Sequence, residues 1–157
     1  MRRLMRLLAG TAGVLVTLLL LSPWLLYAAM LASIEGRPAK PERMVPATEQ
    51  ARIWRLADGQ GELRTEPMTP YGFAWELFAP TGQPAPGETL AYWVSRDFLQ
   101  AQPHRNMLTW HLSNAALTIW LTRNWTAEEL ASAVAPIASK WPSPKTDSAS
   151  VVPPAQL

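Results

Sequence analysis

The sequence contains no cysteine and few charged residues. Without cysteine, the chain has no disulfide framework, no cysteine-based zinc or iron–sulfur site and no thiol nucleophile. Charged residues make up only 17% of the chain, and three of the 14 basic ones, Arg2, Arg3 and Arg6, precede a long apolar run. The remainder has 11 basic residues against 12 acidic ones and no basic patch, so we expect no nucleic-acid partner.

Histidine is also scarce. His104 and His111 are the only two in the sequence, and a metal site needs about three protein ligands. We therefore expect no metal site and no cofactor, and we interpret a histidine near a helix start as a capping or surface residue.

The apolar run from Leu7 to Ile34 contains no charged residue. It exceeds the roughly 20 residues that a helix needs to cross a bilayer. The alternative is a cleaved signal peptide, whose apolar stretch is normally about 7–15 residues long. The length of the run favours an uncleaved transmembrane helix over residues 7–34, preceded by a cytoplasmic tail over residues 1–6.

The flanks of this run indicate its orientation. Arginines abut its N-terminal end within a very short tail, which favours a cytoplasmic N-terminus. Trp24 and Tyr27, near the other end, are typical of an interfacial aromatic belt. We expect a single-pass protein of a bacterial inner membrane, with the C-terminal part in the periplasm.

The rest of the chain divides by composition. Residues 35–50 contain proline and mixed charges without an apolar period, and we interpret them as a linker. Residues 51–140 form the expected small extracytoplasmic domain. Residues 141–157 are rich in proline, serine and small residues, and are expected to be a disordered tail.

Two different patterns open this domain. Residues 51–57 alternate apolar and basic side chains before Asp58–Gly61 and residues 62–66, which predicts a β-hairpin. Residues 67–87 hold five prolines among aromatic residues, which predicts an irregular but ordered loop.

About three helices follow, so the predicted fold is mainly α. The first ends near Gln100, the second follows Pro103, and the third opens with a capping box at Thr126–Glu129. Their apolar positions recur at helical spacing: Leu90, Trp93, Val94 and Phe98; Leu108, Leu112, Ala115, Ala116 and Ile119; Leu130, Ala131 and Val134. Tryptophans on or beside these helices are expected to fill a small core: Trp93, Trp110, Trp120 and Trp125.

Glu76 lies in an aromatic stretch between Tyr71 and Phe78. Apolar neighbours can favour the neutral acid and so suit a carboxyl group to general acid–base work. The simpler interpretation, which we favour, is a carboxylate at the edge of an apolar cluster with its oxygens in water.

Two stretches within residues 87–130 resemble glycosyltransferase family 51, the peptidoglycan transglycosylases. The sequence GETLAYWVSRDFL, from Gly87, is similar to the family segment G-S-T-I-S-Q-Q-L-A-K-N-L-F, with Thr89 matched and Arg96–Asp97 in place of Lys-Asn. The sequence from Asn114 to Leu130 is similar to E-A-x-x-T-x-x-I-E-x-x-W-S-K-x-x-I, and it keeps Thr118 and Trp125 at the family spacing. The resemblance implies a transglycosylase-like domain that binds a cell-envelope partner or a lipid-linked glycan, with Thr89, Arg96, Asp97 and Asn114 as the expected binding residues.

The departures from the family pattern concern the reactive groups. No E-D-x-x-F-x-x-H-x-G segment precedes Gly87, the Gln-Gln pair is Tyr92–Trp93, and the second family Glu aligns with Asn114. Glycosyl transfer of this kind needs a carboxylate base and cations that hold a pyrophosphate leaving group. Arg96 is one such cation, and no base matches. The sequence therefore favours a degenerate relative without the chemistry.

Three hypotheses follow. The first is a non-catalytic single-pass membrane protein whose domain binds an envelope protein or a lipid-linked glycan. The second is an active membrane-bound peptidoglycan glycosyltransferase, in which Glu76 or Glu88 replaces the lost base and Arg96 holds phosphate. The third is an accessory subunit of an envelope complex that is unrelated to the family.

Overall fold

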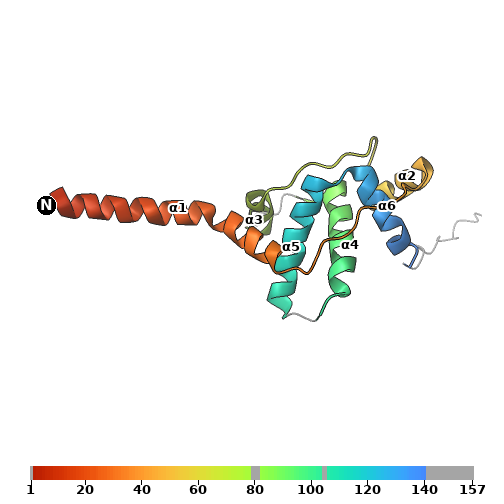
Figure 1. Ribbon diagram of the computed structural model, residues 1–157. Helices are drawn as coiled ribbons and strands as arrows, with labels where there is room; N and C mark the ends of the chain where they lie inside the picture. The colour runs from red at the N-terminus through yellow and green to blue at the C-terminus, as the bar shows by residue number, and fades with distance from the viewer. Residues whose placement is uncertain (1, 79–81, 104–105, 141–157) are drawn as a thin grey trace, which may run out of the picture.

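The computed structural model describes residues 2–78, 82–103 and 106–140. Within them it has six helices and no strand. In chain order these are α1 (Arg2–Ala32), α2 (Ala47–Leu56), α3 (Pro70–Phe78), α4 (Pro86–Gln100), α5 (Met107–Asn124) and α6 (Ala127–Ala138). α1 projects from a bundle of the other five, as Figure 1 shows.

α1 is the one candidate membrane span in the described chain, with mean hydropathy 2.2 over Gly13–Ala32. Its length and composition suit either a single membrane span or a signal sequence. Its first part stands clear of the bundle, and the helix changes direction where it meets the domain (Figure 1). Pro23 lies inside the helix, where its ring and missing N–H favour a kink.

The C-terminal part of α1 packs against α5 and α3. Ile34, just beyond the helix, is 5% exposed and belongs to the core of the bundle. The Arg37 guanidinium donates to the Leu31 carbonyl at 2.9 Å and lies 5.9 Å from the Trp120 ring centre. The apolar helix therefore enters the domain as one of its packed elements.

The core joins α2, α4, α5 and α6. Its fully buried side chains come from every one of these helices: Ile53, Leu90, Leu117, Leu121, Leu130 and Val134. The expectation of core tryptophans is confirmed in full for Trp125, which is 4% exposed. Trp93, Trp110 and Trp120 are only half-buried.

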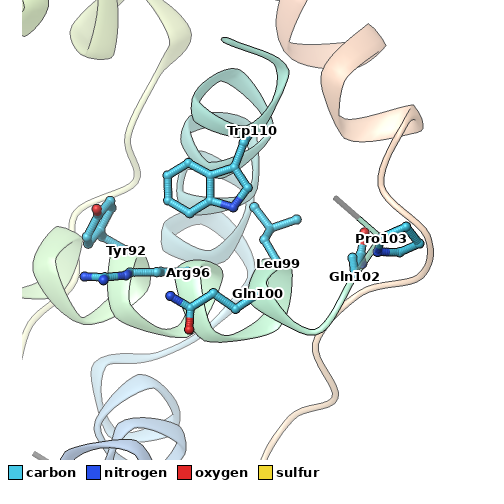
Figure 2. A pocket seen from close by; sticks show the side chains of 7 residues that line it. All are labelled: Tyr92, Arg96, Leu99, Gln100, Gln102, Pro103 and Trp110. Carbon is cyan, nitrogen blue, oxygen red and sulfur yellow. The ribbon is translucent and has the colours of Figure 1, made fainter. Parts of the chain in front are cut away.

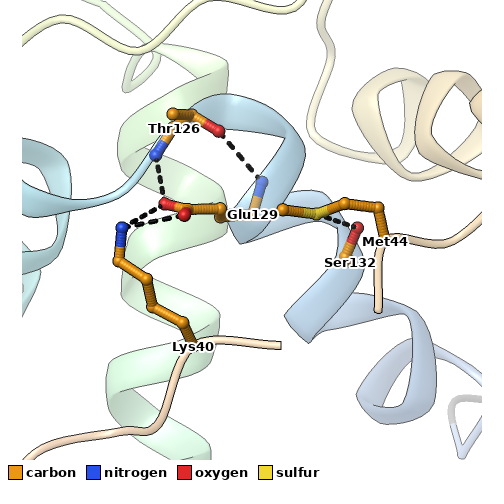
Figure 3. Close-up of polar contacts among 5 residues, drawn as sticks. All are labelled: Lys40, Met44, Thr126, Glu129 and Ser132. Carbon is orange, nitrogen blue, oxygen red and sulfur yellow. Dashed lines mark hydrogen bonds and ion pairs between the residues drawn. The ribbon is translucent and has the colours of Figure 1, made fainter. Parts of the chain in front are cut away.

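The segment expected as a linker over residues 35–50 is held against α6 rather than free. Lys40 Nζ bonds Glu129 Oε1 at 2.8 Å, and the N–H of Val45 donates to Ser132 Oγ at 3.2 Å. Figure 3 shows Lys40 and Met44 reaching this helix beside the Thr126–Glu129 capping box, which is present as predicted. Residues 47–50 form the start of α2.

The predicted β-hairpin over residues 51–66 is wrong. Residues 51–56 lie in α2, because a short alternating run also fits a helix face: Ile53, Trp54 and Ala57 are all buried. An i,i+3 pair between Glu49 and Arg52, at 2.6 Å, lies on the exposed side of the same helix.

The predicted loop over residues 67–87 is wrong in part, because it contains α3 and the start of α4. Pro70 and Pro86 are the first residues of these two helices, the position at which a missing N–H costs no hydrogen bond. The helices predicted after residue 87, after Pro103 and at Thr126 are confirmed as α4, α5 and α6. The tail over residues 141–157 lies outside the described residues.

Candidate functional site

A groove of about 690 Å³ lies where α3, α4 and α5 meet. α4 contributes one face to it, because Glu88, Thr89, Tyr92 and Trp93 are one helical turn apart in pairs. The other lining residues come from α5, from α3 and from the segments around them: Ala57, Asp58, Met68, Phe73, Gln83, Pro84, Leu108, His111, Leu112, Asn114, Ala115 and Thr118.

Core packing fixes the position of the two long walls. α4 and α5 are in contact along their lengths, and each turns another face to the core through residues such as Leu90 and Leu117. Between them, the buried Ser95 hydroxyl donates to the Asn114 carbonyl at 3.1 Å. The groove is therefore bounded by elements that cannot move apart without exposing core residues.

Two buried polar atoms on the groove lack a partner. Asn114 is 3% exposed and Thr118 is 4% exposed, and both line the groove. Asn114 Oδ1 and Thr118 Oγ1 have no hydrogen-bond partner in the part of the chain that the structure describes. A buried polar group without a partner costs about 1–3 kcal/mol, so a ligand donor that reached either atom would recover part of this cost.

The described lining of the groove carries two carboxyl groups, those of Asp58 and Glu88. Its ionisable side chains are Asp58, Glu88, Tyr92 and His111, and no Lys or Arg of the described chain lines it. The remaining lining is mainly apolar or aromatic. This surface suits an apolar segment with donor groups better than a polyanion.

The structure separates the predicted site residues into two groups. Glu88, Thr89 and Asn114 line the groove together. Arg96 and Asp97 lie elsewhere, in a hollow of about 450 Å³ between α4 and the end of α6. Glu88, one of the two acids that the enzyme hypothesis combines with Arg96, therefore lines a different cavity from Arg96.

Arg96 also borders a second hollow, of about 480 Å³, beside Trp110 of α5. Figure 2 shows its guanidinium extending toward Tyr92 on the same helix, with Gln100 one turn further on. Tyr92 lines both this hollow and the groove. Arg96 lies about 6 Å further along α4 than Tyr92, the residue that this hollow shares with the groove.

Glu76, the other candidate base, lies in α3, but its side chain is outside the described part of the structure. His104 is also outside it. His111 is exposed on the groove. No group of three His, Asp or Glu side chains within the described residues is placed to hold a metal ion.

The sequence analysis missed the role of Thr118, which it recorded only as a family match. A signal was present: Asn114, Thr118 and Thr122 recur every four residues on an otherwise apolar stretch of α5, and all three are buried. Thr122 satisfies its hydroxyl internally, whereas the other two residues line the groove and each keeps a buried polar atom without a partner in the described chain. Met68 and Phe73 could not be placed there, because their segment was expected to be a loop.

Comparison with known proteins gives no relative. The chain matches no protein-family model, no curated protein and no solved structure.

Proposed function

We propose that the chain is a single-pass inner-membrane protein that performs no glycosyl transfer, and that its periplasmic helical domain binds a segment of a cell-envelope protein in the groove between α3, α4 and α5. The observation that carries this proposal is the pair of unpartnered buried atoms, Asn114 Oδ1 and Thr118 Oγ1, on an otherwise mainly apolar groove. Such a surface is complementary to an apolar peptide segment that brings its own donors.

Retention of α1 as an anchor is part of the proposal. Ala28, Ala29 and Ala32 are the small residues at which a signal peptide would be cut. Cleavage there would remove most or all of the helix that packs against α5, and it would leave Ile34 at a new chain end. The involvement of this region in the core supports an uncleaved span.

The acidic lining favours a polypeptide over a lipid-linked glycan. A glycan carried on pyrophosphate would bring negative charge next to Asp58, in a groove whose described lining has no Lys or Arg. Like charges in a half-buried site repel more strongly than in water. The resemblance of residues 87–130 to the transglycosylases supports a cell-envelope setting, and the separation of Glu88 from Arg96 supports loss of the reaction.

The test is photo-crosslinking in living cells with the full chain. A photoreactive residue replaces Leu108, which lines the groove and is 69% exposed, and the control places it at the adjacent Met107, which is 78% exposed and off the groove. We expect a protease-sensitive adduct from position 108 alone. Adding Thr118→Val should reduce its yield, because the isosteric side chain removes one bonding site without changing the shape of the groove.

Other outcomes contradict specific parts of the proposal. Equal adducts from positions 107 and 108 would show that the groove is not the binding site. A protease-resistant adduct that extracts into organic solvent would identify a lipid-linked glycan instead. Polymerisation of lipid-linked precursor by the purified protein, abolished by Glu88→Gln or Glu76→Gln, would restore the enzyme hypothesis.

A further inference from the structure

A short apolar helix is fixed beside the membrane span. α3 contacts α1, and the Tyr71 hydroxyl donates to the backbone carbonyl of Leu20. An apolar cavity of about 190 Å³ is lined by Pro70 and Phe73 of α3, by Pro23 and Leu26 of α1, and by residues of α5. Figure 1 shows α3 on the side of the bundle from which α1 projects.

The contact with Leu20 sets the depth of α3 relative to a bilayer. A span of about 20 residues that begins after Arg6, the last charge before the apolar run, ends near Leu26. Leu20 is six residues earlier, or about 9 Å along the helix axis, so the start of α3 lies within the bilayer at the depth usual for interfacial helices. The span Gly13–Ala32 would place Leu20 about 18 Å before its end, deeper than interfacial helices lie, so an interfacial α3 requires a span that begins near Arg6.

The described outer surface of α3 is suited to this position. Trp75 is 64% exposed and Tyr71 is 44% exposed, an unfavourable exposure in water. Tryptophan and tyrosine are the residues that concentrate where headgroups meet acyl chains. The sequence of α3, PYGFAWELF, carries a single charge, at Glu76.

We propose that α3 is a second membrane-binding element, an interfacial helix that inserts Tyr71 and Trp75 into the leaflet on the side of the domain. This inference rests on the membrane anchoring by α1 that the proposed function includes. Because Phe73 of α3 lines both the groove and the cavity facing α1, insertion holds one wall of the groove at the lipid surface. The binding site then faces partners that are themselves at the membrane.

The test uses the full chain in phosphatidylcholine vesicles. Because the sequence has no cysteine, a fluorophore that reacts with thiols labels only a cysteine introduced by substitution. An environment-sensitive fluorophore is attached to Gly72→Cys, an exposed position of α3 where an added Cβ meets only Thr69 Oγ1, at 3.4 Å. Two matched positions are Leu19→Cys, exposed on α1, and Glu128→Cys, exposed on α6. Quenching by spin-labelled lipids and by aqueous iodide is measured at each.

We expect lipid quenching and loss of iodide quenching at positions 19 and 72, and iodide quenching alone at position 128. Adding Trp75→Glu should restore iodide quenching at position 72, since a charge opposes insertion. Iodide quenching at position 72 equal to that at 128, with position 19 protected, overturns the inference while the anchor stands. Iodide quenching at position 19 overturns both the membrane anchor and the membrane-binding role of α3. If Trp75→Glu leaves iodide quenching at position 72 unchanged, the role of Trp75 in insertion is overturned.

Discussion

Replacing Thr118 by valine should stabilise the domain. The Thr118 hydroxyl is buried on the groove without a hydrogen-bond partner in the described chain. Valine has nearly the same shape, so the substitution removes an unpaired polar group without opening a cavity. From the cost of about 1–3 kcal/mol for such a group, we expect the free energy of unfolding to rise by about 1 kcal/mol or more.

Replacing Thr122, one helical turn further along α5, by valine should have the opposite effect and destabilise the domain. Thr122 is 3% exposed; its hydroxyl donates to the Ile119 carbonyl at 2.9 Å and accepts from the N–H of Met68 at 3.1 Å. Thr122→Val leaves the buried Met68 N–H without a partner, which should lower the free energy of unfolding by about 1–3 kcal/mol. The two variants have the same volume change, the same helix and similar burial, and they differ in whether the hydroxyl is paired.

The assay is thermal and urea unfolding of the detergent-solubilised full chain, followed by far-ultraviolet circular dichroism. One kcal/mol corresponds to a midpoint shift of about 4 °C for a domain of this size, so the two variants should unfold several degrees apart. Equal destabilisation by Thr118→Val and Thr122→Val would refute the reasoning, since it would show that the Thr118 hydroxyl is paired within the protein. Stabilisation by Thr118→Val together with weaker partner crosslinking would mean that the site holds this polar atom for binding, at a cost in stability.

Three further predictions concern the ion pair that holds residues 35–46 against α6, the contact between Gly59 and Trp54, and the side of the membrane on which the domain lies. Burial of the Glu129 carboxyl raises its pKa, but hydrogen bonds from Lys40 and from a backbone N–H outweigh this and hold the pKa below the ordinary 4.5; the charged form therefore stabilises the fold above pH 4.5. Unfolding at a series of pH values should show Glu129→Gln less stable than wild type at neutral pH, with the difference closing as the pH falls below 4.5. In Gly59→Ala the new Cβ would overlap the Trp54 ring, so the free energy of unfolding should fall by about 1–3 kcal/mol, and an unchanged midpoint would contradict this packing. A cysteine at the exposed Gln60 should react with a membrane-impermeant maleimide in cells whose outer membrane alone is permeabilised; reaction only after lysis of the inner membrane would reverse the proposed orientation.

The sequence by itself determined the elements whose signal is long or local. The uncharged run before Ile34 is long enough to specify one helix, and α4, α5 and α6 repeat their apolar residues at helical spacing over several turns. The Thr126–Glu129 capping box gave the start of α6 because both partners lie within one turn. The uncharged run and the arginines that precede it are also the basis for three predictions: a membrane span, its orientation and a periplasmic domain.

Only the tertiary structure decided between patterns that are locally equivalent. In residues 51–57 the apolar side chains fit a strand or a helix equally well, and burial of Ile53 and Trp54 in the core shared with α6 selects the helix. The helix that begins at Pro70 packs against α1 and α5, and the ion pair between Lys40 and Glu129 joins residues far apart in the chain. The groove has the same origin. Glu88 and Arg96 lie about two turns apart on α4, and they line different cavities because different elements pack around each of them.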